Sequence, residues 1–163
     1  MTVDVRDERA GASAAPDCGT PTVLDLDRWG RLAAVAAHTE GVRRPAEMGL
    51  TFVDEPDMAE LAGAWLDSPH PTDVLAFPVD GSRRRAGRRN DGGLLPLLIG
   101  DVVVCPSVAA RQAGEVGRPL VAELALLVVH GVLHLLGHDH AGRIESRRMD
   151  RRTRALLALH DRV

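Results

Sequence analysis

The sequence HGVLHLLGHDH at residues 130–140 holds four of the seven histidines of this 163-residue chain. His130 and His134 are four residues apart, so on an α-helix they share a face and lie about 6 Å apart along the axis. Gly137 predicts the end of this helix, after which the chain can turn and bring His140 back toward the other two. Three imidazoles with one position left for water are typical of a catalytic zinc site. The sequence therefore predicts one Zn²⁺ ion bound by His130, His134 and His140.

Other interpretations explain this cluster less completely. A protonated imidazole is stabilised at the C-terminus of a helix, which would account for one or two of the histidines. It would not account for His130 and His134 within an otherwise aliphatic helix, where an unpaired imidazole is costly. We expect His138 to be a solvent-facing turn residue and Asp139 to support the turn or orient a ligand. Imidazole also binds nickel, copper and iron, so the ligand type alone does not fix the metal.

The residues around the motif predict the fold. Residues 119–136 are apolar on nearly every side, and such a helix belongs in a protein core. Strands are predicted at 2–5, 48–53, 73–79 and 97–105, and further helices at 24–38, 54–66, 107–117 and 143–159. This order favours an α+β fold, with a small mixed β-sheet packed with helices and a central core helix carrying the histidines. One domain is predicted over residues 1–163, with flexible loops at about 10–22 and 80–93.

Composition narrows the class of partner. The formal net charge is −3, so any binding to nucleic acid must come from a local basic patch. Every basic residue is arginine, and two runs are dense: Arg83, Arg84, Arg85, Arg88 and Arg89, then Arg147, Arg148, Arg151, Arg152 and Arg154. Either run could contact RNA phosphates or simply be solvated, and on the last helix Arg147, Arg151 and Arg154 share a face. With two tryptophans, two phenylalanines and no tyrosine, a base-stacking platform is not expected.

The cysteines and the N-terminal segment both indicate a cytoplasmic protein. Cys18 and Cys105 are far apart and form no CxxC pair, so neither a disulfide framework nor a thiolate metal site is expected. The N-terminus lacks a basic head followed by an apolar stretch, and the apolar run at 124–136 is too short to span a bilayer. The expected location is the cytoplasm, with no membrane partner.

The histidine spacing also occurs in a class of proteases. HxxxHxxGxxH is the spacing of the metzincins, whose motif is HExxHxxGxxH. Gly131 stands where those enzymes carry the glutamate that acts as general base. Without that carboxylate a peptidase has no obvious group to activate water, so a metallopeptidase is disfavoured while the metal site remains predicted.

The motif closely resembles HGxLHLxGxDH, the signature of the YbeY family of single-domain bacterial endoribonucleases and ribosomal RNA maturation factors. Further matches follow in family order: VDVRDE at 3–8, PTDVLAFP at 71–78, GDVVVCPSVAARQA at 100–113 and ELALLVVHG at 123–131. The resemblance implies an α+β fold, zinc on the three histidines, and a zinc-dependent single-strand-specific endoribonuclease. It implies action in maturation of the small-subunit ribosomal RNA 3′ end and in ribosome quality control. The implied partners are ribosomal RNA and ribosome or small-subunit assembly proteins, not DNA.

His130, His134 and His140 would act in catalysis through a water bound to the ion. Two carboxylates are candidates for the general base that takes a proton from this water. Asp101 begins the strand DVVVC, and Glu123 lies seven residues before His130, on the same helical face but about 10 Å back. Each could equally orient a ligand or cap a turn. Two readings besides an RNA hydrolase stay open: a non-catalytic zinc-containing ribosome-assembly factor, and a metallopeptidase.

Two positions depart from the family pattern. Relatives usually carry an arginine before the TDVL strand, proposed to act on the phosphate, whereas residues 61–71 contain no arginine or lysine. The residue after Cys-Pro is often glutamate in the family and is Ser107 here. Thr72 and Asp73 lie at a predicted strand start, where they could line the site or cap the strand.

Overall fold

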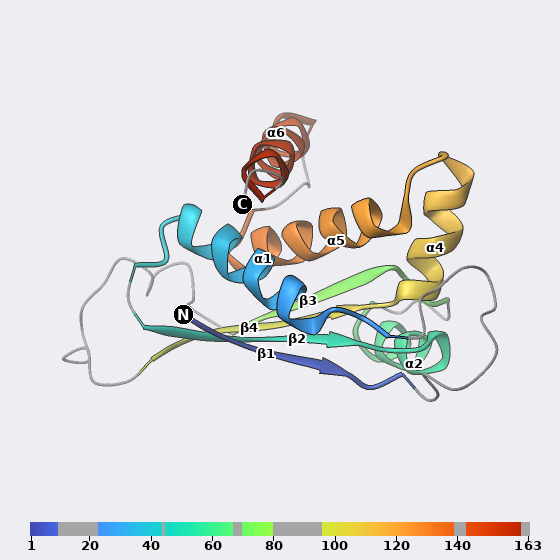
Figure 1. Cartoon of the computed structure of the whole chain (residues 1–163). Helices are drawn as coiled ribbons and strands as arrows, with labels where there is room; N and C mark the ends of the chain where they lie inside the picture. Colours follow the sequence, from blue (N-terminus) through green and yellow to red (C-terminus); the bar gives the residue numbers. More distant parts are fainter. Residues whose placement is uncertain (10–22, 44, 67–69, 80–95, 139–142, 161–163) are drawn as a thin grey trace.

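Four strands pair into one mixed sheet, seen in the computed structural model (Figure 1). The strands are β1 (Thr2–Asp7), β2 (Ala46–Phe52), β3 (Val74–Pro78) and β4 (Leu97–Val104). Their order in the sheet is β1-β2-β4-β3; β1, β2 and β4 are parallel, and β3 runs antiparallel to β4 at the edge. The structure describes residues 1–9, 23–43, 45–66, 70–79, 96–138 and 143–160. The predicted loops at 10–22 and 80–93 fall outside these ranges.

The helices cover the two faces of the sheet unequally. They are α1 (Leu26–Thr39), α2 (Glu55–Leu66), α4 (Pro106–Glu115), α5 (Leu120–Leu135) and α6 (Arg143–His160). α1 and α5 lie on one face, and α6 lies on the outer side of both helices (Figure 1). α2 packs on the opposite face, where Met58 forms a smaller apolar cluster with Leu75 and Val103. The predicted α+β domain built around a central helix is confirmed.

α5 is the centre of the main core. It contacts α1, α4, α6, β3 and β4, and its side chains are buried along most of its length. Apolar residues lie on nearly every side of this helix, as its position among five other elements requires. Among the described residues no single helix is long and apolar enough to cross a membrane; α4 and α5 reach that length and composition only together, at 118° to one another.

A β-bulge in β4 decides which side chains face α5. Glu47 pairs with Leu98 but Met48 pairs with Gly100, which leaves Ile99 as an extra residue. Gly100 has φ +135°, and a Cβ there would lie 2.2 Å from the carbonyl oxygen of Phe77, so the position requires glycine. Because of the extra residue, Ile99 and Val102 are both buried in the main core, and the exposed Asp101 turns to the other face.

Candidate metal centre

The imidazoles of His130 and His134 converge at their Nε2 atoms. These atoms lie 3.2 Å apart, the ring centroids are 4.8 Å apart, and the ring planes are inclined by 77°. A zinc ion about 2.0–2.1 Å from each of two nitrogens in a tetrahedral arrangement requires the nitrogens to be about 3.3–3.4 Å apart. The same separation also permits a hydrogen bond in which one Nε2–H donates to the other ring. The pair therefore has the geometry of two ligands to one ion.

The position of the pair follows from how α5 is enclosed. Leu126, His130 and His134 succeed one another at four-residue intervals and form a partly exposed stripe along a helix that is otherwise largely buried. Both histidines thus remain partly accessible to solvent while the helix that carries them is held in the core. Rigid support of this kind is what a metal ligand needs to keep its orientation.

Gly131 lies on the sheet side of the same helix turn. A Cβ built at this position would lie 2.5 Å from Cγ1 and 3.1 Å from Cγ2 of Val102 on β4. Real Cβ atoms do not approach other carbons so closely, so the close contact of α5 with β4 depends on glycine. The position at which metzincins carry their glutamate therefore has no room for a side chain in this protein.

The end of α5 is fixed by the turn that the sequence predicts. Gly137 has φ +80°, its N–H donates to the carbonyl of His134 (2.8 Å), and the N–H of His138 donates to the carbonyl of Leu133 (2.9 Å). This pair of bonds is a Schellman motif, which favours glycine in the left-handed position. His140 lies outside the described residues, so its role as third ligand stays a prediction. The described residues contain no group of three or more His, Cys, Asp or Glu side chains suited to a metal.

His138 occupies the turn, as expected, but its side chain has a specific partner. Its Nε2 lies 3.0 Å from Oε2 of Glu40, and its side chain is 37% exposed. Arg152 of α6 donates to the other oxygen of Glu40, whose own side chain is only 8% exposed. One buried carboxylate at the end of α1 therefore joins the turn after α5 to α6. Sequence reasoning missed Glu40 because its partners are 98 and 112 residues away along the chain.

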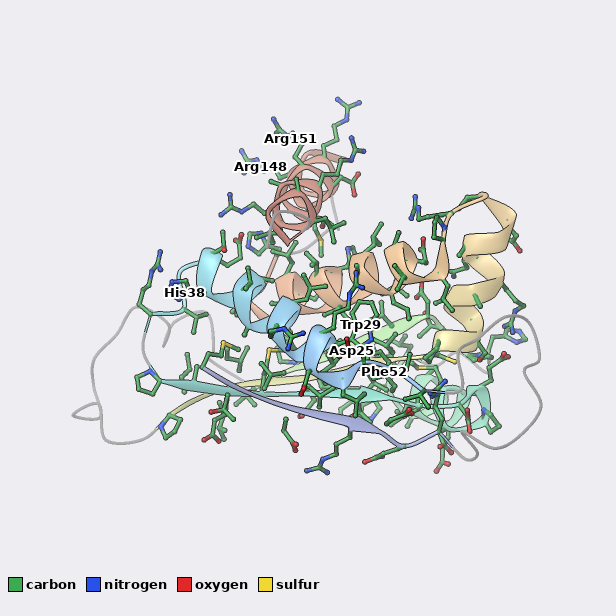
Figure 2. All side chains as sticks on the ribbon, in the orientation of Figure 1. Asp25, Trp29, His38, Phe52, Arg148 and Arg151 are labelled. Atoms are coloured by element: carbon green, nitrogen blue, oxygen red, sulfur yellow. The ribbon has the colours of Figure 1, made fainter. Side chains whose placement is uncertain are left out.

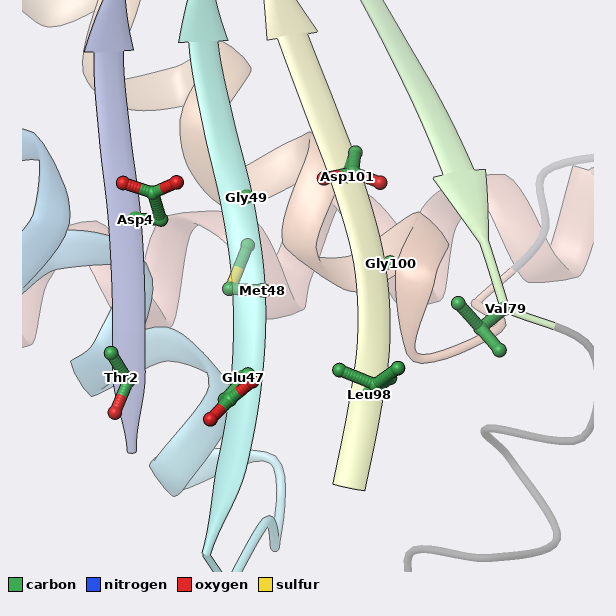
Figure 3. A pocket seen from close by; sticks show the side chains of 9 residues that line it. All are labelled: Thr2, Asp4, Glu47, Met48, Gly49, Val79, Leu98, Gly100 and Asp101. Atoms are coloured by element: carbon green, nitrogen blue, oxygen red, sulfur yellow. The ribbon is translucent and has the colours of Figure 1, made fainter. Parts of the chain in front are cut away.

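The structure does not bring Asp101 to the histidines. The bulge at Gly100 directs its side chain to the face opposite α5, into a hollow of about 250 Å³ whose lining includes Asp4 and Gly49 (Figure 3). The Asp101 carboxylate covers Gly49 closely: a Cβ there would lie 2.2 Å from Oδ1. The β-sheet therefore separates this carboxylate from the imidazoles.

Glu123 lies on the same helix as the histidines, but at its N-terminal end, where its carboxylate has a partner of its own. It is 7% exposed and accepts a hydrogen bond from Arg118, just before α5 begins. An acidic side chain in the first turn of a helix is stabilised there by the backbone amides. Its observed contacts are those of an anchor for the start of α5.

The remaining candidates serve local structure. Asp73 accepts hydrogen bonds from the N–H of Val74 (2.8 Å) and the hydroxyl of Thr72 (3.0 Å), which caps the start of β3. Ser107, the departure from the family pattern, bonds the carboxylate of Glu55 together with Arg111, and the Arg111 hydrogen bond chiefly lowers the pKa of Glu55. These contacts tie α2 to α4 across the edge of the sheet.

Fold and site together define a class of protein: a small α+β domain whose core helix presents paired histidines suited to one metal ion. A family model described as endoribonuclease YbeY matches residues 25–160, and the chain belongs to this family. It is 43% identical over 159 residues to the endoribonuclease YbeY of Thermobifida fusca, covering 97% of this chain and 93% of that protein. It is 48% identical over 137 residues to that of Salinispora tropica, covering 83% and 87%. A solution structure from Thermotoga maritima shares the fold, with TM-score 0.58 at 20% identity over 96% of this chain and 90% of that one.

Proposed function

We propose that this chain is a zinc-dependent endoribonuclease that cleaves single-stranded ribosomal RNA, acting in the cytoplasm on the 3′ end of the small-subunit RNA and in ribosome quality control. The observation that carries the proposal is the convergence of the His130 and His134 Nε2 atoms, 3.2 Å apart, within the family's histidine motif. Ribosome and small-subunit assembly proteins are the proposed partners.

The residues that would hold the ion are His130, His134 and, as the proposed third ligand, His140. When bound, such an ion polarises a phosphate oxygen and lowers the pKa of a bound water toward neutrality. The chain contributes the rigid placement of the rings, because α5 is enclosed and Gly131 lets it lie directly on β4. Asp101 and Glu123 are turned away or engaged elsewhere, so we assign neither of them a direct proton transfer.

A zinc-containing ribosome-assembly factor without nuclease turnover is the second candidate. It is favoured by the absence of an arginine or lysine from residues 61–71 and by the placement of Asp101 and Glu123 away from the imidazoles. A metallopeptidase is disfavoured because position 131 has no room for the glutamate that those enzymes use.

The test pairs metal content with RNA cleavage in three proteins: wild type, His134→Ala and the control His38→Ala. His38 lies on the exposed side of α1, where its ring contacts Arg43. We expect one zinc per chain and cleavage of a 3′-extended small-subunit RNA fragment in wild type and control, and neither in His134→Ala. Thermal unfolding establishes that the variants fold.

Each alternative result has a distinct meaning. One zinc per chain without cleavage by any of the proteins would replace the nuclease by the assembly factor. Zinc content and cleavage that persist in His134→Ala would overturn the proposed centre itself.

A further inference from the structure

α6 has two sharply different sides. Met149, Thr153 and Leu156 are 1%, 5% and 1% exposed, and the two apolar residues belong to the main core. Five of its described arginines are exposed on the rest of its surface: Arg152, which pairs with Glu40, and the four others Arg147, Arg148, Arg151 and Arg154. Figure 2 shows Arg148 and Arg151 pointing away from the body of the molecule. At 100° per residue, Arg147, Arg151 and Arg154 fall within about 60° of one another, opposite the buried side.

Most of the described arginines outside these four have a carboxylate partner, whereas Arg28, Arg31 and Arg43, on α1 and shortly after it, have none among the described residues. Arg6, Arg9, Arg111, Arg118 and Arg152 each pair with a carboxylate. The described residues provide no such partner for any of the four, and Asp150 is the one acid among the described side chains of α6. We call Arg147, Arg148, Arg151 and Arg154 the arginine face of α6. In a chain of net charge −3, these four arginines are a local excess of positive charge that Asp150 offsets only in part.

The arginine face is attached to the histidine end of α5. α6 begins at Arg143, three residues after His140, and packs against α5. Arg152 and His138 bind the same carboxylate of Glu40, so the helix and the turn after α5 share an anchor. A ligand held on α6 is therefore carried by an element fixed to the proposed metal centre.

We propose that the arginine face of α6 binds the phosphate backbone of single-stranded RNA and tethers the strand to the domain that carries the histidines; this inference rests on the proposed function. Guanidinium groups bind phosphate through two parallel N–H donors. Arg147 and Arg154 are seven residues apart, a span of about 10 Å, which matches about three charges of a stacked strand at about 3.4 Å each. Binding on this surface rests on charge and not on base stacking, because the face carries no aromatic side chain.

The test measures binding of a fluorescein-labelled, 2′-O-methylated 20-nucleotide RNA at a series of salt concentrations, and gel electrophoresis of the recovered RNA checks that it stays intact. Zinc-loaded wild type is compared with Arg148→Gln/Arg151→Gln and with the control Arg6→Gln/Arg31→Gln. The control removes the same charge from β1 and α1, where both side chains are exposed. Each phosphate contact with a single strand contributes about 0.7 to the slope of log Kd against log salt. The α6 variant should therefore lose about 1.4 from the slope. With equal affinities of the two proteins at 1 M salt, the variant then binds about 25-fold more weakly than wild type at 0.1 M.

His134→Ala separates this inference from the proposed function. The inference is supported if His134→Ala keeps the wild-type slope while failing to cleave unmodified RNA, and the α6 variant alone loses slope. If wild type cleaves RNA but Arg148→Gln/Arg151→Gln keeps the wild-type slope, the proposed role of the arginine face is overturned and the proposed nuclease stands. A wild type that neither binds nor cleaves RNA would overturn both.

Discussion

Replacing Gly131 by alanine tests whether the histidines depend on the contact between α5 and β4. In an open helix, alanine in place of glycine gains about 1 kcal/mol from helix propensity. Here the new methyl group would lie 2.5 Å from Cγ1 and 3.1 Å from Cγ2 of Val102, both fully buried. Overpacking of this kind costs about 1–3 kcal/mol. We therefore expect Gly131→Ala to lower the free energy of unfolding by about 1 kcal/mol net.

Val102→Ala provides the partner for a double-mutant cycle. It removes both clashing methyl groups and leaves Cβ of residue 102 at 3.4 Å, which is an ordinary contact. Alone it should cost about 2 kcal/mol through lost burial and the cavity left behind. In its background Gly131→Ala should recover the propensity gain of about 1 kcal/mol, which gives a coupling energy of about 2 kcal/mol.

The assay is urea unfolding of the four proteins at one fixed zinc concentration, because a bound ion adds to apparent stability. Gly114→Ala on α4 is the matched control: a Cβ there meets nothing within 4 Å, so the substitution should be neutral or stabilising. A Gly131→Ala protein more stable than wild type, or a coupling energy near zero, would refute the argument that the sheet excludes a side chain at this position.

Three further predictions concern the turn after α5, the Glu40 ion pairs and the buried cysteine. Gly137→Ala should lower the free energy of unfolding by about 1 kcal/mol and weaken zinc retention in a chelator competition, because φ +80° is strained for alanine and the turn follows His134. Glu40→Ala should cost about 1–2 kcal/mol in urea unfolding, whereas Ala in place of the exposed Glu115 should cost almost nothing. Cys105 is fully buried and burial raises its pKa, so a short pulse of N-ethylmaleimide at pH 8 should modify it only after unfolding, as peptide mass spectrometry would show.

The central helix and its histidine pair were predictable because each signal is local. The apolar composition of α5, the four-residue spacing of His130 and His134, and the stop at Gly137 all lie within one short segment. Helix geometry alone then places both rings on one side, and glycine at a left-handed position ends the helix. The structure confirms these three features with few adjustments to the helix bounds.

The side on which Asp101 lies was not predictable from alternation along the strand. A regular strand through Ile99 would place Asp101 on the same face, toward α5 and the histidines. The bulge inserts one residue at this point, so Asp101 lies on the face opposite Ile99. The sequence signals the bulge only through Gly100. A glycine within a strand pattern is a weak indication of a bulge, so the carboxylate could not be assigned to a face in advance.

The Glu40 network was equally hidden, because its three members come from distant parts of the chain and follow no spacing rule. Its consequence is larger than one ion pair. The turn that leaves the histidine helix and the helix that carries the arginine face are held by the same buried carboxylate. Close packing at Gly131 fixes the imidazoles from the sheet side, and Glu40 fixes the following turn from the other side. The proposed delivery of RNA to a metal centre needs the binding surface and the centre in one rigid frame, and these two contacts would connect them.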